Sequence, residues 1–333
     1  MLMLRIRSSI KPRLKMLCHF SIMHPLIDAC SVSVLVVGGM TWERVLIYNF
    51  LAFAMQLPFG MMMDEYPELN RCGFFFGSFL VSASAFAAAF GCAGWFVLAA
   101  ACIGNALFHL TAGKYLLEKN DGHSGAIGLF IATGALGLMA GQVWAEKAAW
   151  LCLPVFASAL AVCVVAVAFR KWTVSGRKTV GACAAVRSQS EDFVNASIER
   201  NVWKIILAKS VLAGLFVLIA WRSWVGLSVS RCSPGECALL MGIGAVVTFG
   251  GKVAGGYIAE YVGRWQVVVV SMAGSVLLAY FCEPSWVIAW FVLLFVAQLA
   301  TGPVLSLVYD RTGRRGGRAF GLNCFGLFAG SFA

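Results

Sequence analysis

Long apolar runs, separated by short polar loops, dominate the pattern of this sequence. Each complete run is close to the roughly 20 residues that a helix needs to cross a bilayer. The runs lie near 17–38, 45–63, 72–91, 93–115, 124–143, 148–169, 203–227, 237–258, 266–282 and 285–308. An eleventh run begins at 318 and is still apolar at Ala333. Because the runs are continuous rather than alternating, they predict an all-α polytopic membrane protein and not a β-barrel.

Composition agrees with a chain whose main solvent is lipid. Hydrophobic residues make up 60% of the chain and charged residues 12%, whereas soluble domains carry about a quarter charged residues. The 12 Cys residues lie mostly inside apolar runs, so we expect them to pack as small hydrophobes. The net charge of +11 does not indicate nucleic acid binding, because the basic residues are spread over short loops beside the predicted spans.

The longest polar segment, 170–202, is basic and divides the chain into two parts. We expect an N-terminal six-helix bundle over 1–169 and an incomplete C-terminal bundle of about five helices over 203–333. With the N-terminus in the cytoplasm, 20 of the 26 Lys and Arg residues fall in cytoplasmic segments and 4 in outer loops. The positive-inside rule therefore predicts a multi-pass protein of the bacterial inner (plasma) membrane with a cytoplasmic N-terminus.

Each half carries a Gly, an acid four residues later and a basic residue beyond, after a span of the same rank. The two sets are Gly60, Asp64 and Arg71, and then Gly256, Glu260 and Arg264. On one helix face, the Gly admits a neighbouring helix while the acid accepts from another helix's N-terminal amides or pairs with a base. We interpret the two sets as gating latches, to which Lys252 also belongs because it shares the face of Gly256. The alternative is that each acid marks a solvated loop.

A second match supports an internal repeat. Ala126 and Gly128 open the fifth span, and Ala319 and Gly321 open the eleventh, at nearly the same offset. A six-helix unit repeated in parallel orientation is the plan of the major facilitator fold. The loop segment 259–265 also resembles the G-x-x-x-D-R-x-G-R-R motif of the major facilitator superfamily, which implies twelve helices and transport. A chain that stops in its eleventh span would then be a fragment or the product of a truncated gene.

The fourth and fifth spans resemble one group of exporters more closely. Gly104, Phe108 and His109 are similar to the G-x-x-x-F-H-P run of the fosmidomycin-resistance type of exporter. The segment 134–141 is similar to the group's helix-5 run, G-N-L-G-x-x-x-G-P. This resemblance implies proton-coupled export by an antiporter. The sequence departs from the group's Pro, Asn and Pro at Leu110, Ala135 and Gln142.

Polar residues inside spans mark candidate binding groups, because a charge at the bilayer centre costs about 2.5–3.5 kcal/mol. Asp28 lies mid-span, four residues after His24, so the two share a helix face. They form either a protonatable pair, with Asp28 carrying the coupling proton, or an interhelical packing contact. Asn105 and His109 are a second candidate pair at the same spacing. Lys209 either faces the cavity, where it would suit an anion, or extends to the cytoplasm.

The sequence carries no indication of an enzyme. It has no GxxxxGK[ST] nucleotide loop, and neither a catalytic constellation nor a His, Cys and carboxylate cluster with metal-ligand spacing is visible, so we expect no cofactor and no metal. We predict a secondary active transporter that moves a small solute by alternating access, with proton-coupled export as the first choice. The alternative is a transport-inactive membrane sensor or interaction protein. Expected partners are a small solute, protons and the bilayer, without nucleic acid, and the expected state is a monomer.

Overall fold

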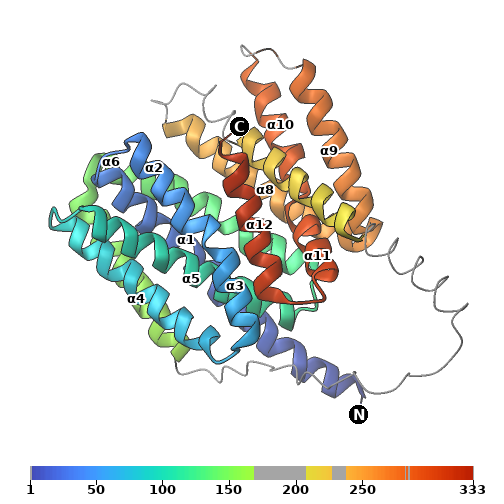
Figure 1. The fold of residues 1–333 in the computed structure, drawn as a ribbon, viewed down its shortest axis with the longest axis horizontal. Coiled ribbons are helices and arrows are strands. Elements are labelled where there is room, and N and C mark those ends of the chain that lie inside the picture. The colour runs from blue at the N-terminus through green and yellow to red at the C-terminus, as the bar shows by residue number, and fades with distance from the viewer. Residues whose placement is uncertain (1, 169–207, 227–237, 282, 284–285, 333) are drawn as a thin grey trace, which may run out of the picture.

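The computed structural model describes residues 2–168, 208–226, 238–281, 283 and 286–332, with side chains from residue 14 onward. Within these residues the secondary structure is helical throughout (Figure 1). Nine of the described helices are long and apolar enough to cross a membrane. The prediction of an all-α polytopic fold is therefore confirmed. The predicted basic linker, 170–202, lies outside the described residues.

The N-terminal half follows the predicted spans closely. Its elements are α1 (Leu2–Val37), α2 (Trp42–Asn49), the π-helical turn η1 (Phe50–Ala54), α3 (Gln56–Glu65), α4 (Leu69–Ala89), α5 (Trp95–Lys119) and α6 (Ser124–Ala168). The elements α2, η1 and α3 follow one another as a single span over Trp42–Glu65. Thr41 caps α2 by accepting a hydrogen bond from the Arg44 amide.

The long helix α6 covers two predicted spans. Ala148 inside it has non-helical backbone angles (φ −155°, ψ 51°), and this break separates the stretches 124–147 and 149–168. Each stretch is close to the length that crosses a bilayer. The fifth and sixth spans are thus joined without a polar loop, since the backbone break at Ala148 is enough to change the direction of the helix.

The C-terminal half is described from residue 208 onward. Its elements are a helix over Ala208–Gly226, then α8 (Ala238–Val262), α9 (Arg264–Phe281), α10 (Val287–Leu299), α11 (Thr301–Arg311) and α12 (Gly316–Gly330). α10 and α11 together form one span, Val287–Arg311, where the sequence predicted 285–308. The eleventh predicted run is α12, which begins two residues before its predicted start.

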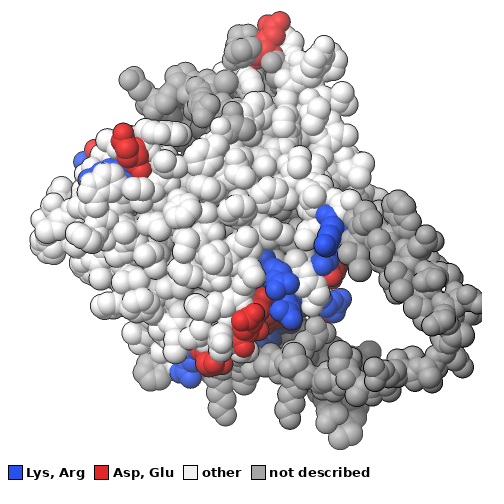
Figure 2. Space-filling model, viewed as in Figure 1, with Lys and Arg blue, Asp and Glu red and all other residues white. Residues whose placement is uncertain are grey.

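The surface is that of a protein in lipid. Figure 2 shows a broad uncharged surface with Lys, Arg, Asp and Glu near its edges. Large apolar side chains are exposed along the helices, among them Phe79 (65% exposed), Phe96 (93%) and Trp150 (72%). Exposed apolar area on this scale does not occur on a soluble monomer.

Small residues on α6 let it pack directly on α1. A Cβ atom added at Gly137 would overlap the backbone of Pro25, and one added at Gly141 would overlap the backbone of Ala29. Helices in lipid associate through such small-residue contacts, because no hydrophobic driving force separates apolar side chains from apolar lipid tails. This close approach turns the polar face of α1, which carries His24 and Asp28, towards α6.

Two crossings join the halves, and both rest on glycine. α3 packs on α12, where a Cβ atom at Gly60 would overlap the carbonyl of Gly317 (Figure 1). α6 packs on α8, where a Cβ atom at Gly256 would meet the carbonyl of Ser124. The end of α3 and the end of α8 therefore each meet the start of a helix from the other half.

Candidate functional site

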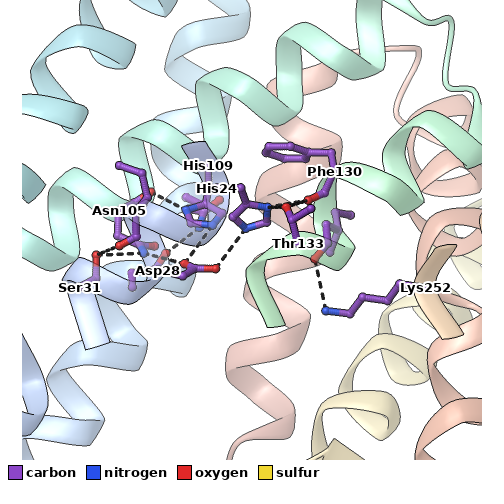
Figure 3. Close-up of polar contacts among 12 residues, drawn as sticks. His24, Asp28, Ser31, Asn105, His109, Phe130, Thr133 and Lys252 are labelled. Atoms are coloured by element: carbon purple, nitrogen blue, oxygen red, sulfur yellow. Dashed lines mark hydrogen bonds and ion pairs between the residues drawn. The ribbon is translucent and has the colours of Figure 1, made fainter. Parts of the chain in front are cut away.

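Three titratable side chains meet inside the N-terminal half. His24 and Asp28 come from α1 and His109 comes from α5 (Figure 3). Nε2 of His24 lies 3.2 Å from Oδ2 of Asp28, and Nε2 of His109 lies 3.3 Å from Oδ1 of the same carboxylate. The three residues are 4%, 6% and 8% exposed. We call them the His–Asp cluster.

Backbone carbonyls set the orientation of both imidazole rings. Nδ1 of His24 lies 2.6 Å from the carbonyl oxygen of Phe130, and Nδ1 of His109 lies 2.8 Å from that of Asn105. A carbonyl can only accept, so Nδ1 is the nitrogen that donates in each ring. The Nε2 atoms of both rings are thereby left to face Asp28. Figure 3 shows both rings directed at this carboxylate.

Asn105 and Ser31 hold the carboxylate from its other side. Nδ2 of Asn105 donates to Oδ1 of Asp28 at 3.1 Å and to Oγ of Ser31 at 3.2 Å. Ser31 in turn donates to the carbonyl of Ile27. Since Asn105 and Ser31 are both buried, the position of Asp28 is fixed by a network of groups that are themselves hydrogen-bonded.

Helix α6 closes the cluster through a glycine. A Cβ atom at Gly134 would overlap Oδ2 of Asp28 and crowd Nε2 of His24. The residue before it, Thr133, lies 3.4 Å from Nδ1 of His24 through its hydroxyl group. The absence of a side chain at residue 134 therefore leaves space directly beside the carboxylate.

The structure brings four of the predicted binding residues together. His24, Asp28, Asn105 and His109 were predicted as two pairs on separate spans, and they form one cluster. The expectation that no His and carboxylate group has metal-ligand spacing was wrong in its geometry, because one ligand atom each from His24, Asp28 and His109 lie within 4.8 Å of one another. The equal i, i+4 spacing on the two spans was the available signal.

Lys209 does not join this cluster. It lies at the start of the described helix over Ala208–Gly226, where it is exposed, and it forms no ion pair among the described residues. Its assignment to the substrate cavity was therefore wrong. The structure places another cation near the cluster instead, because Nζ of Lys252 donates to the carbonyl of Ile131 at 3.4 Å on α6 (Figure 3).

A cavity of about 350 Å³ lies between α6 and the C-terminal half. Its apolar walls come mostly from α6, α8 and α10, and its polar lining groups are Gln142, Thr248, Lys252 and Gln298. The His–Asp cluster is not part of this lining. α6 separates the two, since Gly134 contacts the cluster whereas Ala135 lines the cavity.

The first predicted latch joins α3 to the start of α12. Asp64 accepts hydrogen bonds from the amides of Gly317 at 2.9 Å and Arg318 at 2.8 Å. Amides at a helix start lack partners within their own helix and attract negative charge. Nζ of Lys114, on α5, also lies 2.6 Å from Asp64 and 2.5 Å from Glu118. Asp64 thus bridges the two halves.

The second predicted latch joins α8 to the start of α6. Oε1 of Glu260 accepts from the amides of Ser124 at 2.5 Å and Gly125 at 3.4 Å. Nε2 of His123 lies 3.3 Å from the other carboxylate oxygen. A third contact between the halves, from Arg314 to Asp121 at 2.7 Å, lies at the surface. We call the end of the molecule that carries these contacts the latch face.

Three basic residues that were assigned to the latches lie elsewhere, and these assignments were wrong. Arg71 is exposed and sits 5.9 Å from the ring of Phe75, so Lys114 rather than Arg71 neutralises Asp64. Arg264 pairs with Asp310 at 2.8 Å. Lys252 lines the cavity. In each case the acid of the latch finds its partner on another helix.

Comparisons with known proteins find likeness in structure and not in sequence. No protein-family model and no curated protein sequence matches the chain. Among solved structures, two of the E. coli fucose:proton symporter FucP match with a TM-score of 0.67 at 14% and 13% identity, covering 98% of this chain and 90% of theirs. The second of these is described as a major facilitator superfamily transporter in the outward conformation.

The chain has the major facilitator fold. A bacterial homologue of the iron transporter ferroportin, solved in an outward-facing state, matches less closely, with a TM-score of 0.52 and 14% identity over 95% of this chain and 89% of that one. In the major facilitator fold, two six-helix units are related by an axis along the membrane normal. The latches of Asp64 and Glu260 follow that relation, because each joins the end of a helix in one unit to the start of a helix in the other.

Replacing Lys114 by Met is expected to destabilise the protein by about 3–5 kcal/mol, because loss of one member of a buried ion pair leaves its partner uncompensated. Lys114 is 4% exposed and Asp64 depends on it. Unfolding in mixed detergent micelles measures the loss. Lys119→Met is the matched control, since Lys119 lies on the same helix and forms no ion pair among the described residues. Equal stability of the two variants would contradict the assignment of Lys114.

Proposed function

We propose that the protein is a secondary active transporter that moves a small solute across the bacterial inner membrane by alternating access, coupled to protons. The observation that carries the proposal is the buried His–Asp cluster, with Asp28 between two imidazoles. Ionisable side chains inside a membrane bundle are costly and commonly mark proton relays or substrate paths. The major facilitator fold supports the same class of function, since the two halves can rock around a central site.

In this proposal Asp28 carries the coupling proton and α6 transmits its state to the cavity. His24 binds the carbonyl of Phe130 on α6, and Lys252 of the C-terminal half binds the next carbonyl, that of Ile131. A change in the charge of the cluster alters the contact between His24 and α6. Because the cavity lies on the other side of α6, the same movement changes the place where a solute sits.

The two latches supply the alternating step. With both latches made, the latch face, which we expect to be cytoplasmic, is closed. Breaking the contacts of Asp64 and Glu260 releases the start of α12 and the start of α6 together. A ligand that binds better to one of the two states then shifts the population towards it. Export remains our first choice of direction because of the resemblance of the fourth and fifth spans to an exporter group.

The test is a flux measurement with the purified chain in vesicles. A pH gradient is imposed, and small organic ions, drugs and metal ions are screened for movement driven by that gradient. We expect at least one solute to move faster than in vesicles without protein, and its addition to move protons in return. A folded protein that moves no solute across a broad panel would reject transport and favour the sensor or interaction protein.

A further inference from the structure

The His–Asp cluster presents three electron-pair donors to one another without a hydrogen between them. In a neutral imidazole one nitrogen donates and the other accepts, and Nδ1 donates to a backbone carbonyl in both His24 and His109. Each Nε2 atom therefore directs a lone pair at a carboxylate oxygen only 3.2 or 3.3 Å away. Acceptors so placed repel each other unless a cation lies between them.

The spacing of these atoms fits a metal ion. Bonds from Zn²⁺ to imidazole nitrogen and carboxylate oxygen are about 2.0–2.1 Å, which places neighbouring ligand atoms of a tetrahedron about 3.3 Å apart. The two contacts of Asp28 have this length, and one atom from each of the three residues falls within 4.8 Å of the others. Two imidazoles and one carboxylate are a recurrent ligand set for transition metals.

The surroundings of the cluster also fit. Histidines that bind metals almost always donate their second ring nitrogen to a carbonyl or carboxylate, and the ligating carboxylate is itself hydrogen-bonded. Both features are present, through the carbonyls of Phe130 and Asn105 and through the Asn105 amide on Asp28. Gly134 leaves the space beside Asp28 free of a side chain. The ring of Phe130 stacks on His24 at 4.6 Å between centroids and shields it.

We propose that His24, Asp28 and His109 bind a divalent transition-metal ion of the class of Zn²⁺, Co²⁺ or Fe²⁺. Ligand nitrogens favour these ions over Mg²⁺ and Ca²⁺, which take oxygen ligands. This inference rests on the function proposed above, because it assigns a ligand class to the same cluster. Metal ion and proton then compete for the same atoms, since a protonated imidazole cannot bind metal.

The test is a titration of the full-length chain with Co²⁺, followed by visible absorption. The affinity tag carries no histidine, and the four His residues of the chain are then the only imidazoles present. We expect one Co²⁺ per chain with the strong visible bands of a four-coordinate ion and without thiolate charge-transfer bands. The double variant His24→Gln/His109→Gln should bind at least about tenfold more weakly, which is the least that loss of even an outer partner costs a metal site.

Two further variants complete the design. Gly134→Ala keeps every ligand but adds a methyl group where the ion would sit, so it should weaken binding as well. His19→Gln, on the same helix but outside the cluster, should bind as wild type does. All variants are compared at equal thermal stability by size-exclusion profile and melting temperature.

Equal Co²⁺ affinity in the wild type and the double variant, dominant thiolate bands, or no binding by the wild type would overturn the proposal. The flux assay decides transport separately. Binding without flux would reject the transporter and keep the metal site, whereas gradient-driven flux without binding would do the reverse.

Discussion

Asp28→Asn is expected to reduce gradient-driven flux to the level of vesicles without protein. Asp28 is the only carboxylate in the His–Asp cluster, and it receives contacts from both imidazoles and from Asn105. An amide has the same shape but neither gains nor loses a proton. The cluster would then keep one charge state, so a pH gradient could no longer drive the cycle.

Two measurements separate loss of coupling from loss of folding. Glu43→Gln is the matched control, because it also removes a carboxylate but at an exposed position. Solute exchange without a gradient needs no net proton movement, so we expect part of it to persist in Asp28→Asn. Wild-type dependence of flux on the pH gradient in Asp28→Asn would reduce Asp28 to a packing group.

The apolar runs predicted the helices well because length and composition determine which segments can cross lipid. The predicted second span, 45–63, falls within Trp42–Glu65, and the predicted tenth, 285–308, overlaps Val287–Arg311. The join within α6 was less visible. Lys147 and Glu146 suggested a loop there, but the chain passes from one stretch to the next through a backbone break at Ala148 alone.

Contacts between helices were harder to predict than the helices themselves. The i, i+4 spacing showed that His24 and Asp28 share a face, and that Asn105 and His109 do. It carried no information on which two spans meet, so the single cluster was not foreseen. That meeting depends on the close packing of α1 with α6 and of α1 with α5, which is a property of the folded bundle.

The ion pairs show the same limit. The prediction chose the basic residue nearest in sequence, Arg71, as the partner of Asp64. The actual partner, Lys114, is 50 residues away and reaches Asp64 from α5. Neutralising a buried carboxylate requires a cation that is buried with it, and Lys114 is buried whereas Arg71 is exposed. Sequence distance could not reveal this difference in burial.

The latch residues set the relative stability of the two states of the proposed cycle. A hydrogen bond to a charged group contributes about 1.5–3 kcal/mol, and a neutral acceptor keeps roughly half of that. The double variant Asp64→Asn/Glu260→Gln keeps side-chain size and loses this difference at both latches. We expect a cost to the latch-closed state on the order of 2–3 kcal/mol, which shifts the ratio of the two states roughly a hundredfold.

Spin-label distances can detect this shift in a background without native cysteines. Labels at Tyr66→Cys and Arg311→Cys lie on exposed positions of the two halves at the latch face. The double variant should lengthen their separation, and labels at Met40→Cys and Leu239→Cys, placed towards the other end of the molecule, should approach. The single variants should each give a partial shift, because the two latches act on the same equilibrium from separate places. Unchanged distances at both faces would mean that Asp64 and Glu260 stabilise the fold without gating it.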